Sequence, residues 1–251
     1  MSKLTTLLFD VDGTLAETEE IHRQSFNRSF TQEGLDWHWS QQMYAELLAV
    51  TGGKERIRYY LANHQPEFTV SGDLDEYIAA LHASKTVIYT ETMAAGNVPM
   101  RPGIKRLINE ARQSGLRLGI ATTTTPANVS ALLQHNLAPD AESWFEVIAA
   151  GGVVPAKKPA PDIYHYAMQA MGVSPAECLA FEDSENGLRS ARAAELQTLV
   201  TVSEYTREHN FDAAALVLDQ LGEPGSPFQV ISGAAGLHRM VTVELLQELC
   251  P

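Results

Sequence analysis

The chain has 251 residues, of which 45% are hydrophobic, and its 18 basic and 31 acidic residues give a formal net charge of −13. This length and apolar content suit one large domain, or a core with a smaller second domain, and argue against a disordered chain. The negative field disfavours nucleic acid and membrane surfaces as partners, so an anionic substrate would need local attraction from a metal ion or from placed Lys and Arg side chains.

A core of alternating strands and helices is predicted from the short apolar runs. The first run, residues 4 to 9, leads into the polar loop Asp10-Val11-Asp12-Gly13-Thr14, which is typical of a buried strand. Further strands are expected at residues 116 to 121, 145 to 149, 178 to 181, 198 to 202 and 215 to 218, with helices such as 104 to 114 and 160 to 171 between them. The order predicts an α/β fold with a doubly wound parallel sheet.

A helical insertion is predicted directly after the first polar loop, because no strand-like run intervenes up to residue 95. Its expected helices cover residues 19 to 30, 41 to 48, 55 to 62 and 74 to 93. Gly96 and the helix breakers of residues 99 to 103 mark the return to the core. The expected division is a core of residues 1–15 and 96–221, a helical cap domain of 16–95, and a tail of 222–251 that is a loop to residue 235 and then a short helix ending near Leu249.

Asp10 and Asp12 follow the first strand, at the edge where open α/β sheets bind ligands. One carboxyl group can attack a substrate while the other transfers protons. The pattern alone also fits a solvated turn or the beginning of a calcium loop. A calcium loop is disfavoured because no glutamate follows at the spacing of an EF-hand.

Three more polar segments follow later strands: Thr122-Thr123-Thr124-Thr125, Lys157-Lys158-Pro159 and Glu182-Asp183-Ser184. Each by itself also fits a polar strand end, a loop with proline in the first turn of a helix, or a helix N-cap cluster. Together with the first loop, their order resembles the four signatures of the haloacid-dehalogenase superfamily. The resemblance implies a HAD-like core whose inserted segment is an α-helical cap domain.

The resemblance implies a Mg²⁺-dependent phosphoryl transfer. Asp10 would attack phosphorus to form an aspartyl-phosphate, and Asp12 would protonate the leaving oxygen and then deprotonate water. Thr122 and Lys158 would bind the phosphoryl group, with Thr123 and Thr124 beside them. The implied ligands of Mg²⁺ are the carboxylates of Asp10 and Asp183, the backbone carbonyl of Asp12, and Glu182, which alternatively orients Lys158.

The predicted cap should select the substrate. His22 follows Thr18 by four residues, so the two share a helix face, although His22 also fits a partly buried packing role. In Gly52-Gly53-Lys54-Glu55-Arg56, two glycines enter a helix where backbone N–H groups could meet a second phosphate; an ordinary loop before a helix is the alternative. It is not a nucleotide P-loop, because Glu55 follows Lys54.

With Lys85-Thr86 and Arg101-Pro102-Gly103, these segments resemble the CbbY family over residues 3 to 221. That family is similar to β-phosphoglucomutase in fold but acts on phosphosugars as a phosphatase. The resemblance implies removal of the 1-phosphate of xylulose-1,5-bisphosphate, an inhibitor of Rubisco and hence of carbon fixation. The implied contacts are Glu17 and His22 with sugar hydroxyls, Gly53, Lys54 and Arg56 with the distal phosphate, and Lys85 on the cap side.

Rival functions stay open at this point. A phosphosugar mutase shares the nucleophile, the metal site, His22 and the basic loop, although Glu17 and the double glycine favour a phosphatase. A phosphatase of small acids such as phosphoglycolate would not need a distal anion site. A non-catalytic phosphosugar sensor would be expected to have lost the nucleophile or metal ligands, which are present.

The chain shows no run of about eighteen apolar residues, and its first residues lack the apolar region of a signal peptide. Cys178 and Cys250 provide neither a disulfide framework nor a zinc spacing. We therefore expect a cytoplasmic protein, and we expect it to be a monomer.

Overall fold

Seven strands form one sheet in the computed structural model, which describes residues 4–95 and 98–250. Their order across the sheet is β3-β2-β1-β4-β5-β6-β7. The strands are β1 (Thr6–Phe9), β2 (Arg117–Ala121), β3 (Val147–Ala149), β4 (Cys178–Glu182), β5 (Gln197–Thr201), β6 (Leu216–Leu218) and β7 (Val230–Gly233). The α-helices are α1 (Glu19–Gln32), α2 (Gln41–Leu47), α3 (Gly53–His64), α4 (Leu74–Ala94), α5 (Ile104–Gln113), α6 (Pro126–Leu132), α7 (Asp162–Met171), α8 (Glu185–Ala193) and α9 (Val243–Leu249).

Strand β1 lies at the centre of the sheet and pairs in parallel with β2 and β4. All of its residues are buried, as expected of a strand covered on both faces. Phe9 aligns with Ile120 on one side and with Phe181 on the other, and its ring stacks on that of Phe181 with centroids 4.5 Å apart. The carboxyl ends of three neighbouring strands therefore meet at one edge.

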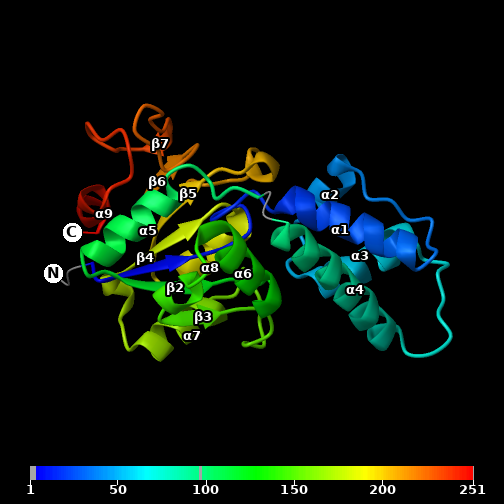
Figure 1. Cartoon of the computed structure of the whole chain (residues 1–251). Helices are drawn as coiled ribbons and strands as arrows, with labels where there is room; N and C mark the ends of the chain where they lie inside the picture. Colours follow the sequence, from blue (N-terminus) through cyan, green and yellow to red (C-terminus); the bar gives the residue numbers. More distant parts are fainter. Residues whose placement is uncertain (1–3, 96–97, 251) are drawn as a thin grey trace.

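Helices cover both faces of this sheet (Figure 1). Leu7 and Phe9 pack in a cluster with residues of α5, α6 and α9, whereas Leu8 packs with residues of α7 and α8. Alternate residues of one strand point to opposite faces, so the two clusters are separate layers. The predicted doubly wound α/β fold is confirmed.

The prediction of a loop over residues 222 to 235 was wrong near its end, because Val230–Gly233 form β7, which pairs antiparallel with β6. All residues of β7 are exposed, so this segment lacks the buried alternation that marks a strand in a sequence. The free backbone groups along β6 supply the pairing that the local sequence does not show. The short helix expected near the end is α9, which ends at Leu249 as predicted.

Helices α1 to α4 form a second body beside the sheet (Figure 1). They enclose a cluster of their own that is rich in aromatic rings, including Phe26, Phe30, Trp39 and Tyr44. Helix α4 packs on α1 and also reaches α6 of the core. The inserted helical cap is thus confirmed, whereas its exact boundaries stay predictions, and Gly96, the expected return point, lies outside the described residues.

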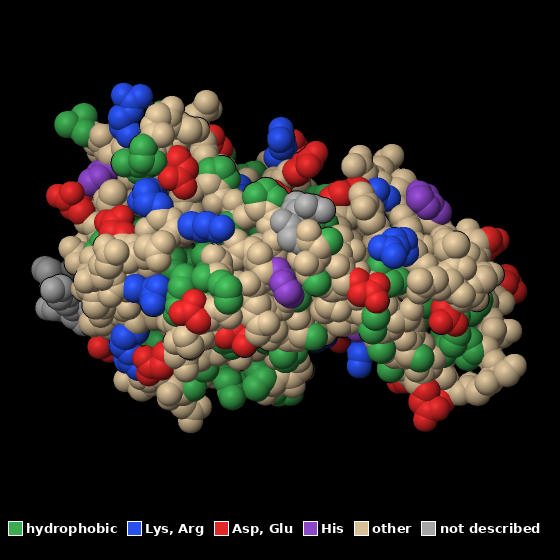
Figure 2. Space-filling view, viewed as in Figure 1, with side chains coloured by type: hydrophobic (Ala, Val, Ile, Leu, Met, Phe, Trp, Pro, Cys, Tyr) green, Lys and Arg blue, Asp and Glu red, His purple; other side chains and the backbone are tan. Residues whose placement is uncertain are grey.

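Acidic and basic side chains are scattered over both bodies on the face shown in Figure 2 rather than gathered by sign. Within residues 4–95 and 98–250, no helix combines the length and the apolar content that a membrane crossing requires. The cytoplasmic location and the monomeric state stay predictions.

Arg101 ties several strand ends of the core together. Its guanidinium group is buried directly after the cap and donates hydrogen bonds to backbone carbonyl oxygens of the core loops. The acceptors are Gly13, Thr201 at 3.0 Å, Val202 at 2.6 Å and Asp219 at 2.9 Å. One side chain therefore links the loop after β1 to the ends of β5 and β6.

We expect Arg101→Met to lower the free energy of unfolding by about 3 kcal/mol, because it leaves several buried carbonyl groups without donors. Urea unfolding of both proteins would measure this loss. As a matched control, Arg58→Met removes an exposed arginine that pairs with Asp75, and it should change stability by less than about 0.5 kcal/mol. Equal effects of the two substitutions would contradict the role given to Arg101.

Candidate active site

The predicted signature residues meet at the carboxyl edge of the sheet. Asp10 directly follows β1 and Thr122 directly follows β2. Lys158 lies in the loop between β3 and α7, while Glu182 ends β4 and Asp183 follows it. Residues that are up to 173 positions apart, from Asp10 to Asp183, are thus brought together by the parallel order of the strands.

Lys158 holds the nucleophile candidate and a second carboxylate. Its Nζ atom donates to Asp10 Oδ1 at 2.7 Å and to Glu182 Oε1 at 2.6 Å, and all three side chains are buried. The hydroxyl group of Tyr164 also donates to Glu182 Oε1. Burial alone would lower the pKa of Lys158, but the charges of Asp10 and Glu182 outweigh it and raise that pKa. The side chain therefore stays an ammonium ion.

Asp10, Glu182 and Asp183 each place a carboxylate oxygen within 4.8 Å of the others. Burial raises the pKa of Asp10 to about 7, with Lys158 opposing and Glu182 adding to the shift. Burial and the charge of Asp10 raise the pKa of Asp183 well above its usual range, although Ser203 donates to its Oδ2 at 2.7 Å. Crowded, buried carboxylate oxygens are a donor set that suits a hard divalent cation such as Mg²⁺.

Two glycines leave the space that these carboxylates occupy. A Cβ atom at Gly13, where φ is +78°, would collide with the carboxylate of Asp183. A Cβ atom at Gly187 would collide with the carboxylate of Glu182. Both glycines lie in the sequence signatures. The structure explains why glycine is needed at each position: a carboxylate group approaches the backbone too closely for a side chain to fit.

Asp12 is connected to the cap through hydrogen bonds. Its Oδ1 atom accepts from Thr18 Oγ1 at 2.6 Å and lies 2.9 Å from His22 Nε2. Lys85 of α4 contacts Nδ1 of the same ring, and Tyr89 stacks on that ring with centroids 4.2 Å apart. Burial tends to raise the pKa of Asp12, but His22, Thr18 and Lys85 outweigh burial and lower it.

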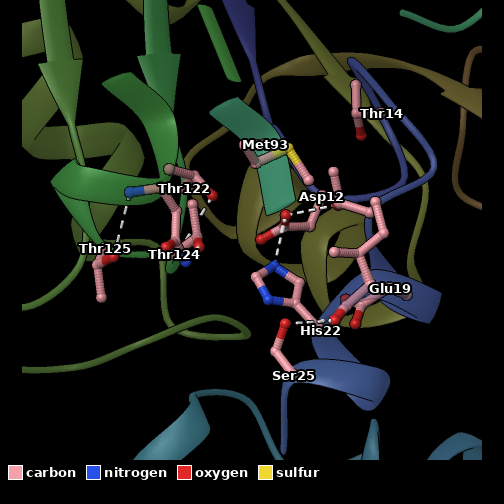
Figure 3. A network of polar contacts seen from close by, with 12 residues as sticks. Asp12, Thr14, Glu19, His22, Ser25, Met93, Thr122, Thr124 and Thr125 are labelled. Atoms are coloured by element: carbon pink, nitrogen blue, oxygen red, sulfur yellow. Dashed lines mark hydrogen bonds and ion pairs between the residues drawn. The ribbon is translucent and has the colours of Figure 1, made fainter. Parts of the chain in front are cut away.

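The threonine segment stands opposite this network. Figure 3 shows Thr122 and Thr124 on one side of the space and Asp12 with His22 on the other. Thr122 Oγ1 accepts from the backbone N–H of Thr124 at 3.3 Å, and Thr124 Oγ1 accepts from Asn128 at 2.8 Å. The strand end is therefore a folded loop rather than a solvated one.

Core and cap together line an open cavity of about 1210 Å³. The predicted site residues that line it are Asp10, Asp12, His22, Gly53, Lys54, Arg56, Lys85, Thr122, Thr123, Thr124, Lys158 and Asp183. Glu182 is not in the lining, since it lies buried behind Lys158. The cavity has an acidic floor from the core and several basic groups from the cap.

Two predicted substrate residues have other partners. Glu17 is not in the lining of the main cavity; it faces a second cavity of about 380 Å³ and lies 3.4 Å from Arg101 Nε. Arg56 is buried and donates to the carbonyl of Leu47 at 3.1 Å and to the hydroxyl of Tyr44 at 2.9 Å. The structure thus does not bring Glu17 to the cavity, and the substrate contacts of both side chains stay predictions.

Ser203 and Tyr164, which were not predicted as site residues, donate to the buried carboxylates. Ser203 comes directly after an expected strand, the same position that singled out Thr122, so this signal was present in the sequence. Tyr164 sits in an amphipathic helix, where an aromatic residue is normally read as core packing. Only its contact with Glu182 shows its polar role.

Comparison with known proteins matches residues 4–195 to the haloacid dehalogenase-like hydrolase family model. The chain is 56% identical to protein CbbY of Rhodobacter capsulatus, over 84% of this chain and 91% of that protein. It is 48% identical to the plasmid-encoded protein CbbY of Cupriavidus necator, over 97% and 96% of the two chains. The crystal structure of a CbbY mutant from Rhodobacter sphaeroides in complex with xylulose-1,5-bisphosphate is 45% identical, with a TM-score of 0.82 over 87% of this chain and 96% of that one.

The buried Lys85 gives the protein a testable dependence on pH. Burial lowers the pKa of Lys85 from its ordinary value of 10.5 to about 7, although Asp12 and Glu19 oppose the shift. Between these values the unfolded chain binds a proton that the folded chain has released, so stability relative to Lys85→Met should rise with pH by about 1.4 kcal/mol per unit.

Urea unfolding of the wild type and of Lys85→Met across this pH range would measure the difference. Lys105→Met, at an exposed lysine, serves as a control whose difference from the wild type should stay flat. A flat difference for Lys85→Met as well would show that its ammonium group is not disfavoured by burial.

Proposed function

The chain belongs to the haloacid dehalogenase-like hydrolase family, and from this membership we propose that it is a phosphatase that removes the 1-phosphate of xylulose-1,5-bisphosphate. The observation that carries the proposal is the placement of Asp10. Its Oδ1 atom is held 2.7 Å from Lys158 Nζ at the floor of a cavity that also presents Asp12 and basic residues of the cap. This arrangement suits an anionic substrate with a phosphate at the floor.

Asp10 acts as the nucleophile in this proposal. Its carboxylate oxygen forms a bond to phosphorus while the bond from phosphorus to the sugar oxygen breaks. Lys158 orients the carboxylate and, with the Thr122 hydroxyl, binds oxygens of the phosphoryl group. Water then attacks the aspartyl-phosphate, which releases inorganic phosphate and restores Asp10.

Asp12 transfers the protons of both steps. In the first step the leaving sugar oxygen takes a proton from Asp12, and in the second Asp12 takes one from the attacking water. The lowered pKa of Asp12 suits the second step. For the first step, Asp12 can receive its proton from His22 Nε2, 2.9 Å from Oδ1, while the ammonium group of Lys85 passes a proton to Nδ1 of the same ring.

Mg²⁺ fits the donor set of the cavity floor. The carboxylates of Asp10 and Asp183 and the backbone carbonyl of Asp12 would hold the ion, with Glu182 as a further ligand or as the partner that orients Lys158. When bound, the ion would offset the negative charge of the carboxylates and of the phosphoryl oxygens. Burial raises the pKa values of Asp10 and Asp183, and a bound cation would favour the ionised form in which both can act as ligands.

The choice of substrate rests on the cap and on the relatives. The CbbY protein of Rhodobacter sphaeroides, 45% identical to this chain, was crystallised with xylulose-1,5-bisphosphate. In this chain, Lys54 at the beginning of α3 and Lys85 of α4 line the cavity above the acidic floor, where a second phosphate needs positive charge. Removal of this inhibitor would link the protein to Rubisco and carbon fixation.

We expect rapid release of inorganic phosphate from xylulose-1,5-bisphosphate with Mg²⁺, and slower release from ribulose-1,5-bisphosphate, β-glucose-1-phosphate and phosphoglycolate. Asp10→Asn should lower kcat by about a thousandfold or more, because it removes the attacking oxygen. Asp212→Asn, the same change at an exposed position, is the matched control. Glucose-6-phosphate formed from glucose-1-phosphate without phosphate release would instead indicate a mutase, and no turnover at all a sensor.

A further inference from the structure

Glu55 and Lys157 form an ion pair that joins the cap to the core. Lys157 Nζ lies 2.7 Å from Glu55 Oε1 and 2.8 Å from Oε2. Glu55 belongs to the first turn of α3, and Lys157 directly precedes Lys158 in the core. Both side chains line the main cavity, so the pair faces the space that the substrate would occupy.

The carboxylate of Glu55 lies over the beginning of α3. A Cβ atom at Gly52 would collide with Glu55 Oε2 and would lie 2.6 Å from Lys157 Nζ. Burial tends to raise the pKa of Glu55, but hydrogen bonds from Lys157 and from its own backbone N–H outweigh burial and lower it. A helix N-terminus attracts negative charge, and here a side chain of the protein supplies that charge.

Basic side chains of the cap line the cavity near this carboxylate. Burial and the nearby charges of Lys85 and Lys54 lower the pKa of His82 to about 3. The His82 ring packs directly on Gly53, lines the cavity, and makes no side-chain hydrogen bond within the part of the chain that the structure describes. Lys54 and Lys85 also line the cavity, and with the ring nitrogens of His82 they suit a larger anion than one carboxylate.

The ion pair is weak enough for another anion to replace the carboxylate of Glu55 on Lys157. The side chains of Glu55 and Lys157 are 41% and 25% exposed, and pairs of such exposure are weak. A phosphate group carries up to two negative charges and more acceptor oxygens than a carboxylate, so it is the stronger partner for an ammonium group. Asn186 also reaches the cap, 3.2 Å from Thr51 Oγ1 and 3.3 Å from the carbonyl of Ala49, and would keep this loop at the core while the pair opens.

We propose that Glu55 is a built-in stand-in for the distal phosphate of the substrate. A bisphosphate displaces the carboxylate and takes Lys157 as its partner, whereas a monophosphate leaves the pair closed. This inference rests on the proposed phosphatase function and makes the two residues specificity determinants of opposite sign. Lys157 favours the second phosphate, and Glu55 competes with it.

The test compares Glu55→Gln with Lys157→Gln by phosphate release from xylulose-1,5-bisphosphate and from xylulose-1-phosphate. For the bisphosphate, Glu55→Gln should lower KM about threefold because the competitor is gone, and Lys157→Gln should raise it about tenfold. The double variant should resemble Lys157→Gln, because Glu55 acts only through Lys157. For the monophosphate, both single variants should keep KM within about threefold of the wild type, because this substrate has no second phosphate for Lys157 to bind.

Lys157→Arg, which keeps the cation, should retain a KM for the bisphosphate within about threefold of the wild type. Asp75→Asn breaks a cap ion pair outside the cavity lining and should leave both KM values as they are. Thermal melting checks that each variant is folded.

Single variants that raise the bisphosphate KM equally would overturn the inference, since the pair would then be only a latch, and would leave the proposed function intact. A wild type that turns over the monophosphate but not the bisphosphate would overturn both the proposed substrate and the inference.

Discussion

Three carboxylates are buried side by side at the carboxyl edge of the sheet, and their repulsion is the constraint on which the surrounding structure depends. Lys158 offsets part of the negative charge by bonding to Asp10 and Glu182 at once. Ser203 donates a hydrogen bond to Asp183, the carboxylate that Lys158 does not contact. Burial and the neighbouring carboxylates still raise the pKa values of Asp10 and Asp183, and a divalent cation would stabilise their ionised forms.

The constraint also shapes the backbone. Gly13 and Gly187 lack side chains where carboxylates stand, and Arg101 holds the loop that contains Gly13 against the ends of β5 and β6. The loop after β5 presents Ser203 to Asp183. Buried polar groups are costly without partners, and the hydrogen bonds of Lys158, Ser203 and Arg101 supply partners that hold the loops of the edge as one network, although Oε2 of Glu182 has none.

The cap contributes side chains to the candidate site in addition to covering it. Asp12 reaches His22 of α1, and that ring contacts Lys85 of α4, so the proton-transfer group of the proposed mechanism is oriented by cap residues. The same body presents Lys54 and His82 to the cavity. Lys54, Lys85, Lys157 and Lys158 line the cavity of a chain whose net charge is −13, and they would supply the local attraction that an anionic substrate needs.

The sequence by itself determined the fold class, the helical insertion and the core of the site, because apolar strands and the polar residues after them are local patterns. Asp10, Thr122, Lys158 and Asp183 could be found in this way. Contacts between residues far apart in the chain were decided only by the tertiary structure. Glu55 and Lys157 are 102 positions apart, and the local sequence around either residue does not indicate that the two form an ion pair. Strand β7 likewise forms because it pairs with the free edge of β6, and no local pattern of apolar residues in the sequence indicates this pairing.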